Sequence, residues 1–238
     1  MISSENINTH ISEFDGIHKL ALSVDCVILG YDEESLKVLL VECNTPPFVG
    51  KLSLLGELVN PDETLDEAAH RVLGIWTGQE SLYLEEVRTF SNVDRHPLGR
   101  VITVAYYSLV EIDHFELSGM NKMNLKWVDV NSVGDLAFDH TKILNECLDS
   151  LQQRLREKPI GFNLLPEKFT LNQLQNLYEV VLGITLDKRN FRRKILSLDV
   201  LIDLVEMQQD VAHRPAKLYG FDHDKYAQNR SQGFKFEI

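Results

Sequence analysis

The stretch that decides the fold of this 238-residue chain spans residues 50–79 and reads GKLSLLGELVNPDETLDEAAHRVLGIWTGQ. Its second half places apolar side chains at helical spacing between Thr64 and Gly78, and glycine is a common end for a helix. The pattern predicts a helix over residues 64–78 whose apolar face packs against other elements of the domain.

Segments rich in Val, Ile and Leu lie on both sides of this helix and are typical of strands. They span residues 21–29, 36–42, 82–90, 100–112 and 125–128. The turn Tyr31-Asp32-Glu33-Glu34 separates the first two, which predicts a hairpin. A second amphipathic helix is expected over residues 140–157. Together these elements favour an α+β fold in which a mixed sheet lies between helices, as an α/β/α sandwich.

Composition and charge exclude several classes of protein. The chain has 24 Lys and Arg against 36 Asp and Glu, a net charge of −12, which excludes a protein that is basic over its whole surface. Its three cysteines, Cys26, Cys43 and Cys147, are too few and too far apart for a disulfide framework or a zinc site, and they suit a reducing compartment. No apolar stretch has the length of a bilayer span and none reads as a secretory signal, so a cytoplasmic protein without a membrane partner is expected.

A domain boundary is predicted where Pro159 and Gly161 interrupt the pattern of the 140–157 helix. Residues 1–158 hold 13 bases and 26 acids, whereas residues 159–238 hold 11 bases and 10 acids. Five of those 11 bases lie between Lys188 and Lys194. Such uneven charge indicates a second module with a partner of its own, although a solvated helix face would give the same cluster.

The second module has the pattern of a winged helix-turn-helix. Thr170-Leu171-Asn172-Gln173 forms a capping box before a helix that ends at Gly183, and Asp187 can cap a second, basic helix over residues 188–196. Residues 201–208 and 216–221 can then pair as a hairpin, the wing, around the connection 209–215. In this arrangement the second helix enters the major groove of DNA.

The residues expected to bind DNA are Thr170, Lys188, Arg189, Asn190, Arg192, Arg193, Lys194, Arg214 and Lys217. Arg189, Asn190 and Arg192 are the better candidates for reading bases, because Arg and Asn suit bidentate contacts with base edges. The wing residues Arg214 and Lys217 are expected at phosphates.

The spacing of Glu63, Arg71 and Gly78 resembles the Nudix box, G-x5-E-x7-R-E-U-x-E-E-x-G-U. Glu57 stands where the box begins with glycine, and the three later glutamates are replaced, in order, by Val72, Ile75 and Trp76.

Those three replacements predict that the domain does not hydrolyse a pyrophosphate. Nudix hydrolysis needs Mg²⁺ or Mn²⁺, which carboxylate oxygens bind, and two aliphatic side chains and an indole cannot bind them. No catalytic residue, metal site or cofactor is therefore expected, and Trp76 is expected to pack in the core.

A polar loop between two strands, residues 91–100, is the best candidate for a ligand site in the first module. It reads SNVDRHPLGR, and a solvated turn is its alternative. The residues expected to bind a small effector are Glu57, Glu63, Asp94, Arg95, His96 and Arg100. At the start of the second helix, Asp139 or His140 is expected to have the structural role of capping it.

A degenerate Nudix box, a D-R-x-P-x-G-R loop and the tail FNLLPEKFTLNQLQNLYEVVLGITLDKRNFRRK, residues 162–194, together resemble the Nudix-related transcriptional regulator family. The resemblance covers about residues 21–226, and the tail is its most specific part. It implies a homodimer whose Nudix domains bind an effector and whose winged helices bind a palindromic operator. The basic helix contacts DNA in the family, which carries over to Lys188, Arg189, Asn190, Arg192 and Arg193. Effectors in the family are ADP-ribose-type metabolites or pentoses such as arabinose.

The charge of the first module favours a pentose. An anionic pyrophosphate entering a domain of net charge −13 would need Arg95 and Arg100 to offset the repulsion, whereas a neutral sugar would not. The chain is thus expected to be a ligand-responsive regulator, a repressor. Two alternatives stay open: a Nudix pyrophosphatase of ADP-ribose-like nucleotides with an accessory tail, and a module that binds a protein through its basic helix.

Overall fold

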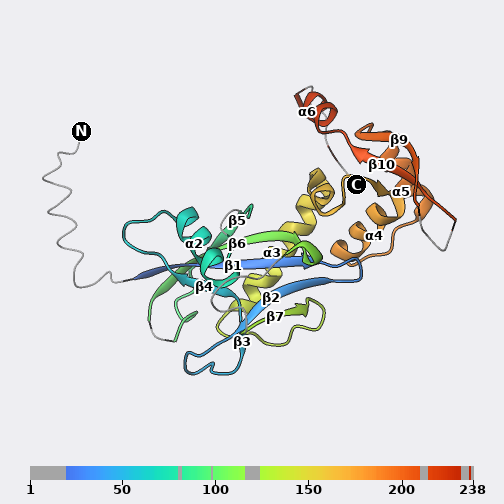
Figure 1. The fold of residues 1–238 in the computed structure, drawn as a ribbon. Helices are drawn as coiled ribbons and strands as arrows, with labels where there is room; N and C mark the ends of the chain where they lie inside the picture. The colour runs from blue at the N-terminus through green and yellow to red at the C-terminus, as the bar shows by residue number, and fades with distance from the viewer. Residues whose placement is uncertain are drawn as a thin grey trace, which may run out of the picture.

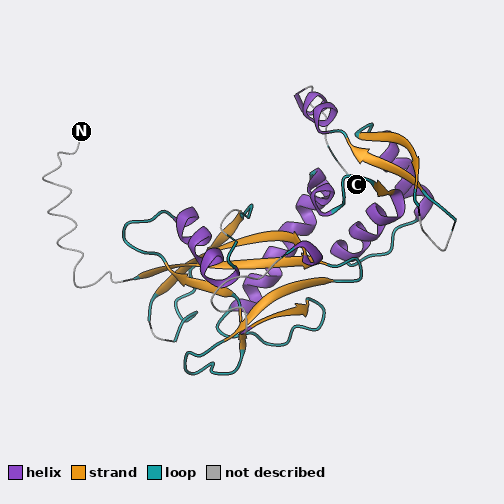
Figure 2. Ribbon diagram, viewed as in Figure 1, coloured by secondary structure: helices purple, strands orange, loops and turns teal. Residues whose placement is uncertain are grey.

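The computed structural model describes residues 20–79, 82–97, 99–115, 124–209, 214–231 and 236 (Figure 1). Two parts follow each other along the chain: a mixed sheet with a helix on each face, and a smaller, mainly helical part with a three-stranded sheet (Figure 2). In the described part of the chain, no helix has the length and apolar character needed to cross a bilayer.

The first part is built on a seven-stranded mixed sheet. Its strands are β1 (Ala21–Tyr31), β2 (Leu36–Glu42), β3 (Leu52–Ser53), β4 (Leu55–Leu58), β5 (Glu85–Phe90), β6 (Val101–Glu111) and β7 (Leu125–Asp129). The central strand β1 pairs in parallel with β6 along its whole length. Two strands pair with the other edge of β1: β4 with its first half and β2 with its last residues. Asp25, which has Gly56 of β4 as its cross-strand partner, lies in the first half.

Alternation along β1 sends its side chains into two separate cores. Val24, Cys26 and Ile28 pack with α2 (Leu65–Thr77) on one face. Val27 and Leu29 pack with α3 (His140–Glu157) on the other. The sheet is therefore covered on both faces, and the predicted α/β/α sandwich of Nudix type is confirmed.

The helix predicted from the deciding stretch is present within one residue at each end. Thr64 caps α2 through a capping box with Glu67, and Gly78 ends it with φ at 75°, a conformation that glycine adopts without strain.

The second part contains the predicted helix-turn-helix and wing. It comprises the 3₁₀ helix η3 (Pro159–Leu164), β8 (Phe169–Thr170), α4 (Leu171–Leu182), α5 (Lys188–Ser197), β9 (Leu201–Met207), β10 (Lys217–Phe221) and α6 (His223–Ser231). A sheet of order β8-β10-β9 forms the wing. Residues 210–213 of the predicted wing connection lie outside the described residues. The expected boundary after residue 158 falls between α3 and η3.

The two parts share one hydrophobic core. A single cluster runs from Val27 and Leu29 through Leu151 and Leu155 of α3 to Leu177 of α4. This continuity links the sandwich to the first helix of the helix-turn-helix without a flexible linker.

A polar contact joins the two parts as well. The Asn176 side chain on α4 donates to the Tyr31 hydroxyl at 3.1 Å and to the backbone carbonyl of Glu33 at 2.5 Å. Tyr31 is the last residue of β1, so the central strand of the sheet ends at the helix-turn-helix.

Candidate functional site

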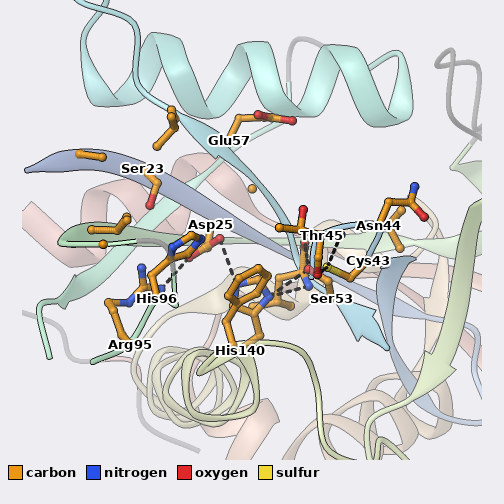
Figure 3. Close-up of a pocket in the computed structure, with 18 of the residues that line it drawn as sticks. Ser23, Asp25, Cys43, Asn44, Thr45, Ser53, Glu57, Arg95, His96 and His140 are labelled. Carbon is orange, nitrogen blue, oxygen red and sulfur yellow. Dashed lines mark hydrogen bonds and ion pairs between the residues drawn. The ribbon is translucent and has the colours of Figure 1, made fainter. Parts of the chain in front are cut away.

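The sandwich contains a cavity of about 860 Å³ at the end of the sheet where β1 and β6 begin (Figure 3). Its wall combines side chains of β1, β4, the loop after β5 and the start of α3, together with Trp76 of α2. These segments are far apart in the sequence, and the shared edge of β1 brings them together.

A buried ionic network forms one wall of the cavity. Arg95 binds the Asp139 carboxylate with two hydrogen bonds, of 2.8 Å from Nη2 and 3.1 Å from Nε. The same Nη2 lies 3.4 Å from the Asp25 carboxylate. The side chains of Arg95 and Asp25 are only 3% and 6% exposed, so the cationic group is shared by two carboxylates away from bulk water.

His140 adjoins this network and is neutral. Its Nδ1 accepts a hydrogen bond from the backbone N–H of Leu54 at 3.0 Å, which leaves the ring proton on Nε2. Burial lowers the pKa of His140, and this effect outweighs the opposing influence of Asp25. The Nε2 atom lies 3.6 Å from the Asp25 carboxylate, so the imidazole presents an N–H toward that acid.

Aromatic rings line another part of the cavity. His96 stacks on Phe138 with 5.0 Å between ring centroids and an interplanar angle of 8°. Burial lowers the pKa of His96, with the nearby Arg95 guanidinium as a smaller cause. Trp76 is half-buried: it packs against the core on the α2 side and also lines the cavity. The expectation of a core tryptophan is therefore met only in part.

Only some of the residues expected to bind an effector lie at the cavity. Glu57, Arg95, His96 and Arg100 line the cavity, and Figure 3 shows Glu57 on the side nearer α2. Arg100 donates through Nη1 to the carbonyls of Ser91 and Asn92.

Two of the expected residues are not among the lining residues. Glu63 instead accepts hydrogen bonds from Arg71 at 2.6 and 2.9 Å, and these lower its pKa to about 2. Asp94 lies exposed on the loop.

The expectation that Asp139 or His140 has the structural role of capping α3 is wrong. Asp139 occupies the N-cap position, but its side chain makes no capping hydrogen bond and binds Arg95 instead. His140 points into the cavity region (Figure 3). Sequence reasoning also missed Asp25 and Ser53, and the one available signal was an acid inside the apolar run 21–29.

The positions of the Nudix-box glutamates do not fit a divalent cation. Val72 is fully buried in the core beneath α2, Ile75 is half-buried and Trp76 lies at the cavity wall. Within the described ranges, no three His, Cys, Asp or Glu side chains come close enough to share a metal ion. None of the three side chains at these positions carries an oxygen that could bind Mg²⁺.

The basic helix α5 presents most of its charged side chains to solvent. Lys188, Arg189, Asn190, Arg193 and Lys194 are exposed, while the apolar stripe of the helix faces the core. Asp187 caps its first turn as predicted.

Arg192 and Arg193 differ in how freely they can reach a ligand. Arg192 is half-buried and donates to Asn172 of α4 at 3.0 Å, so it also joins the two helices. Arg193 is exposed and donates to Asn190 one turn before it.

Three other residues expected at DNA lie outside this helix. Thr170 is 2% exposed, and its side chain caps α4 in the predicted box with Gln173. Lys217 on β10 forms an ion pair with Asp203, and Arg214 is exposed before that strand.

Comparison with known proteins agrees with this two-part organisation. The family model described as the NrtR DNA-binding winged helix domain matches residues 161–221. The ADPR responsive transcriptional repressor NtrR of Acinetobacter baylyi is 32% identical over 209 residues, which are 86% of this chain and 83% of that protein. The chain belongs to the NrtR family of Nudix-related transcriptional regulators. This NrtR-family chain is accordingly a transcriptional regulator with a C-terminal DNA-binding winged helix domain.

Solved structures of Shewanella oneidensis NrtR extend the likeness over the whole fold. The complex of that protein with a 27mer DNA is 30% identical, has a TM-score of 0.73, and the match covers 90% of this chain and 97% of that one. The Nudix domain of the same protein in complex with ADP ribose is 28% identical, with a TM-score of 0.50 and coverage of 59% and 97%.

A third relative belongs to the enzyme class. The ADP-ribose pyrophosphatase of Methanocaldococcus jannaschii is 32% identical over 127 residues, 53% of this chain and 72% of that protein. None of these three relatives supports the expected pentose effector, since their names refer to ADP-ribose or to DNA. The expectation rested on the net charge of the whole domain, which does not describe the polarity of one cavity.

Proposed function

We propose that this NrtR-family protein is a transcriptional repressor that releases its operator when the Nudix domain binds ADP-ribose, without hydrolysing it. The main support for this proposal is the cavity of the sandwich, which is lined by buried polar side chains. In addition, Val72 and Trp76 occupy positions where the Nudix box has metal-binding acids. The names of the relatives from Acinetobacter baylyi and Shewanella oneidensis support ADP-ribose over a pentose.

The charges of the cavity favour one place for the pyrophosphate. Arg95 already binds the carboxylates of Asp139 and Asp25, so its charge is offset. Arg100 lines the cavity and uses Nη1 for two backbone carbonyls, which fixes the guanidinium at the cavity wall. We therefore assign the pyrophosphate to Arg100, since guanidinium groups suit phosphate oxygens.

We also propose a cytoplasmic homodimer that binds a palindromic operator through helix α5. The exposed bases Lys188, Arg189, Arg193 and Lys194, with Asn190, form its DNA-facing surface. Light scattering should give twice the 27.3 kDa mass of one chain. A duplex with two half-sites should bind more tightly than a single half-site.

The release assay uses a duplex that the protein itself selects from a random pool, labelled for fluorescence anisotropy. ADP-ribose should lower the anisotropy to that of free DNA, whereas arabinose at the same concentration should leave the complex intact. Release by arabinose alone would refute the choice of effector. Failure of the protein to enrich any duplex from the pool would refute the proposed DNA binding through α5 and favour the module that binds a protein.

The rival pyrophosphatase is tested separately. Full-length protein with Mg²⁺ and ADP-ribose should release no AMP above background in a chromatographic assay. Steady release of AMP that is lost in Glu63→Gln would establish the enzyme instead.

A further inference from the structure

Asp25 is a buried acid whose hydrogen-bonding capacity is largely unused. It lies inside the central strand β1, is 6% exposed, and points into the cavity (Figure 3). Its backbone is held on both sides, by Ala105 of β6 and by Gly56 of β4. The position of the carboxylate is therefore fixed before any ligand arrives.

The contacts of this carboxylate are long. Among the described residues, its side-chain oxygens contact Arg95 Nη2 at 3.4 Å and His140 Nε2 at 3.6 Å. Arg95 is held more closely by Asp139, at 2.8 and 3.1 Å. A carboxylate has about four lone-pair positions, and buried ones are ordinarily filled by well-formed hydrogen bonds. Asp25 thus has acceptor capacity that faces the cavity.

The surroundings decide which donors fit. Asp25 and Asp139 carry two negative charges against one on Arg95, and His140 is neutral, so an anionic phosphate is repelled from this wall. Ser23 and Ser53 line the cavity beside Asp25: the Ser23 hydroxyl can donate and accept, whereas the Ser53 hydroxyl donates to the Leu54 carbonyl at 3.0 Å and so can only accept from a ligand. A group with adjacent hydroxyls matches this combination.

We propose that Asp25 binds the vicinal hydroxyls of a ribose and so sets the specificity of the effector site. The inference rests on the proposed function, because it assigns one part of the ADP-ribose ligand. The pyrophosphate then lies toward Arg100, away from the acids, and Asp25 accepts from two hydroxyls. Either ribose of the ligand has the required chemistry.

Gly56 keeps this arrangement possible. A Cβ atom at residue 56 would lie 2.2 Å from Asp25 Oδ1 and 3.0 Å from the carbonyl of Val24. Any other residue would therefore displace the carboxylate. Gly56 directly precedes Glu57, the residue that aligns with the leading glycine of the Nudix box.

The test is isothermal titration of the full-length protein and of Asp25→Asn with ADP-ribose, ADP and 2′-deoxy-ADP. The variant keeps the size of the side chain, and Arg95 keeps its two bonds to Asp139. We expect ADP-ribose to bind the variant about 10- to 100-fold more weakly, the usual range for losing hydrogen bonds to a charged group. An unchanged affinity for ADP-ribose would overturn the proposal.

The other ligands identify the ribose. If the variant binds ADP as well as the wild type does, Asp25 binds the terminal ribose. If ADP also weakens, and a wild-type preference for ADP over 2′-deoxy-ADP disappears in the variant, Asp25 binds the ribose of adenosine. Equal weakening with an unchanged preference would mean general damage to the cavity and would refute the proposal.

The matched control is Asp139→Asn. It removes a carboxylate from the same guanidinium but leaves Asp25 in place, and Asp139 is not a lining residue. The ligand preferences of the wild type should persist in this control. If the wild-type protein bound neither ADP-ribose nor ADP, the proposed function itself would have failed, which is distinct from failure of the Asp25 assignment. Circular dichroism melts of both variants exclude misfolding as the cause.

Discussion

Restoring one glutamate of the Nudix box should strongly destabilise the domain rather than recover a metal site. The variant is Val72→Glu, whose side chain would replace one that is fully buried between α2 and β1. In the wild type, Val72 packs with Val24, Ile28 and Leu55, and the cluster around it is apolar. A carboxylate at this place would lie among apolar side chains, which stabilise its charge poorly.

The loss of unfolding free energy in Val72→Glu has two contributions. Holding a carboxyl group protonated at pH 7 costs about 4 kcal/mol, at about 1.36 kcal/mol for each unit between pH 7 and its usual pKa of about 4.3. Loss of the buried valine side chain adds about 1.5–3 kcal/mol. Relaxation of the helix offsets part of this, so we expect a loss of about 4–7 kcal/mol, most of the stability of an ordinary domain.

Thermal melts followed by circular dichroism test this estimate, with Ile75→Glu as the matched control. Ile75 is on the same helix but half-exposed, so its substitution should move Tm by less than about 4 °C, whereas Val72→Glu should lower it by about 10 °C or more. The deficit should shrink as the pH falls toward 4, because a raised pKa costs stability only above the pKa of the unfolded chain. A Val72→Glu protein that melts within about 3 °C of the wild type at pH 7 would refute the reasoning.

Asn176→Ala should lower the free energy of unfolding by about 1–3 kcal/mol in urea titrations, because it removes two hydrogen bonds and leaves the buried Tyr31 hydroxyl unpaired; an unchanged midpoint would contradict this. Acidification below about pH 6.5 should destabilise the fold, because burial lowers the pKa of His140 and the unfolded chain takes up the proton first. His140→Asn should make this pH dependence shallower, and an identical slope would argue against the assignment. Arg189→Ala with Arg193→Ala removes four arginines from the proposed homodimer, so it should reduce the slope of log affinity for DNA against log salt concentration by about 3.6, with Tm almost unchanged; an unaltered slope would show that neither arginine meets a phosphate.

Local signals predicted most of the helices. α3 spans the expected residues His140–Glu157, because apolar periodicity and the following Pro159 mark both its face and its end. The capping box of Thr170 with Gln173 likewise predicted the start of α4. These features depend on interactions within a few residues, which a sequence displays directly.

Long-range pairing was not predictable in the same way. The parallel register of β1 with β6 joins residues 21–31 to residues 101–111, and no local pattern specifies it. That register and the β1–β4 pairing place Asp25 near Arg95 and His140, which come from three distant segments. In the sequence, Asp25 therefore resembles an interruption of an apolar strand, and Asp139 resembles a helix cap. Their roles in the ionic network depend on partners far along the chain, which local patterns do not show.

Strand β1 has a consequence for how new sensors of this architecture can arise. The first half of the strand bears Asp25 in the cavity, and its last residue, Tyr31, contacts the first helix of the DNA-binding part. Neighbouring strands pair with β1 along both edges, so we expect this strand to move only together with the sheet. A mutation that displaces β1 at the cavity would therefore also displace the contact of Tyr31 with Asn176 of α4. We expect substitutions that displace this strand to alter effector binding and DNA binding together.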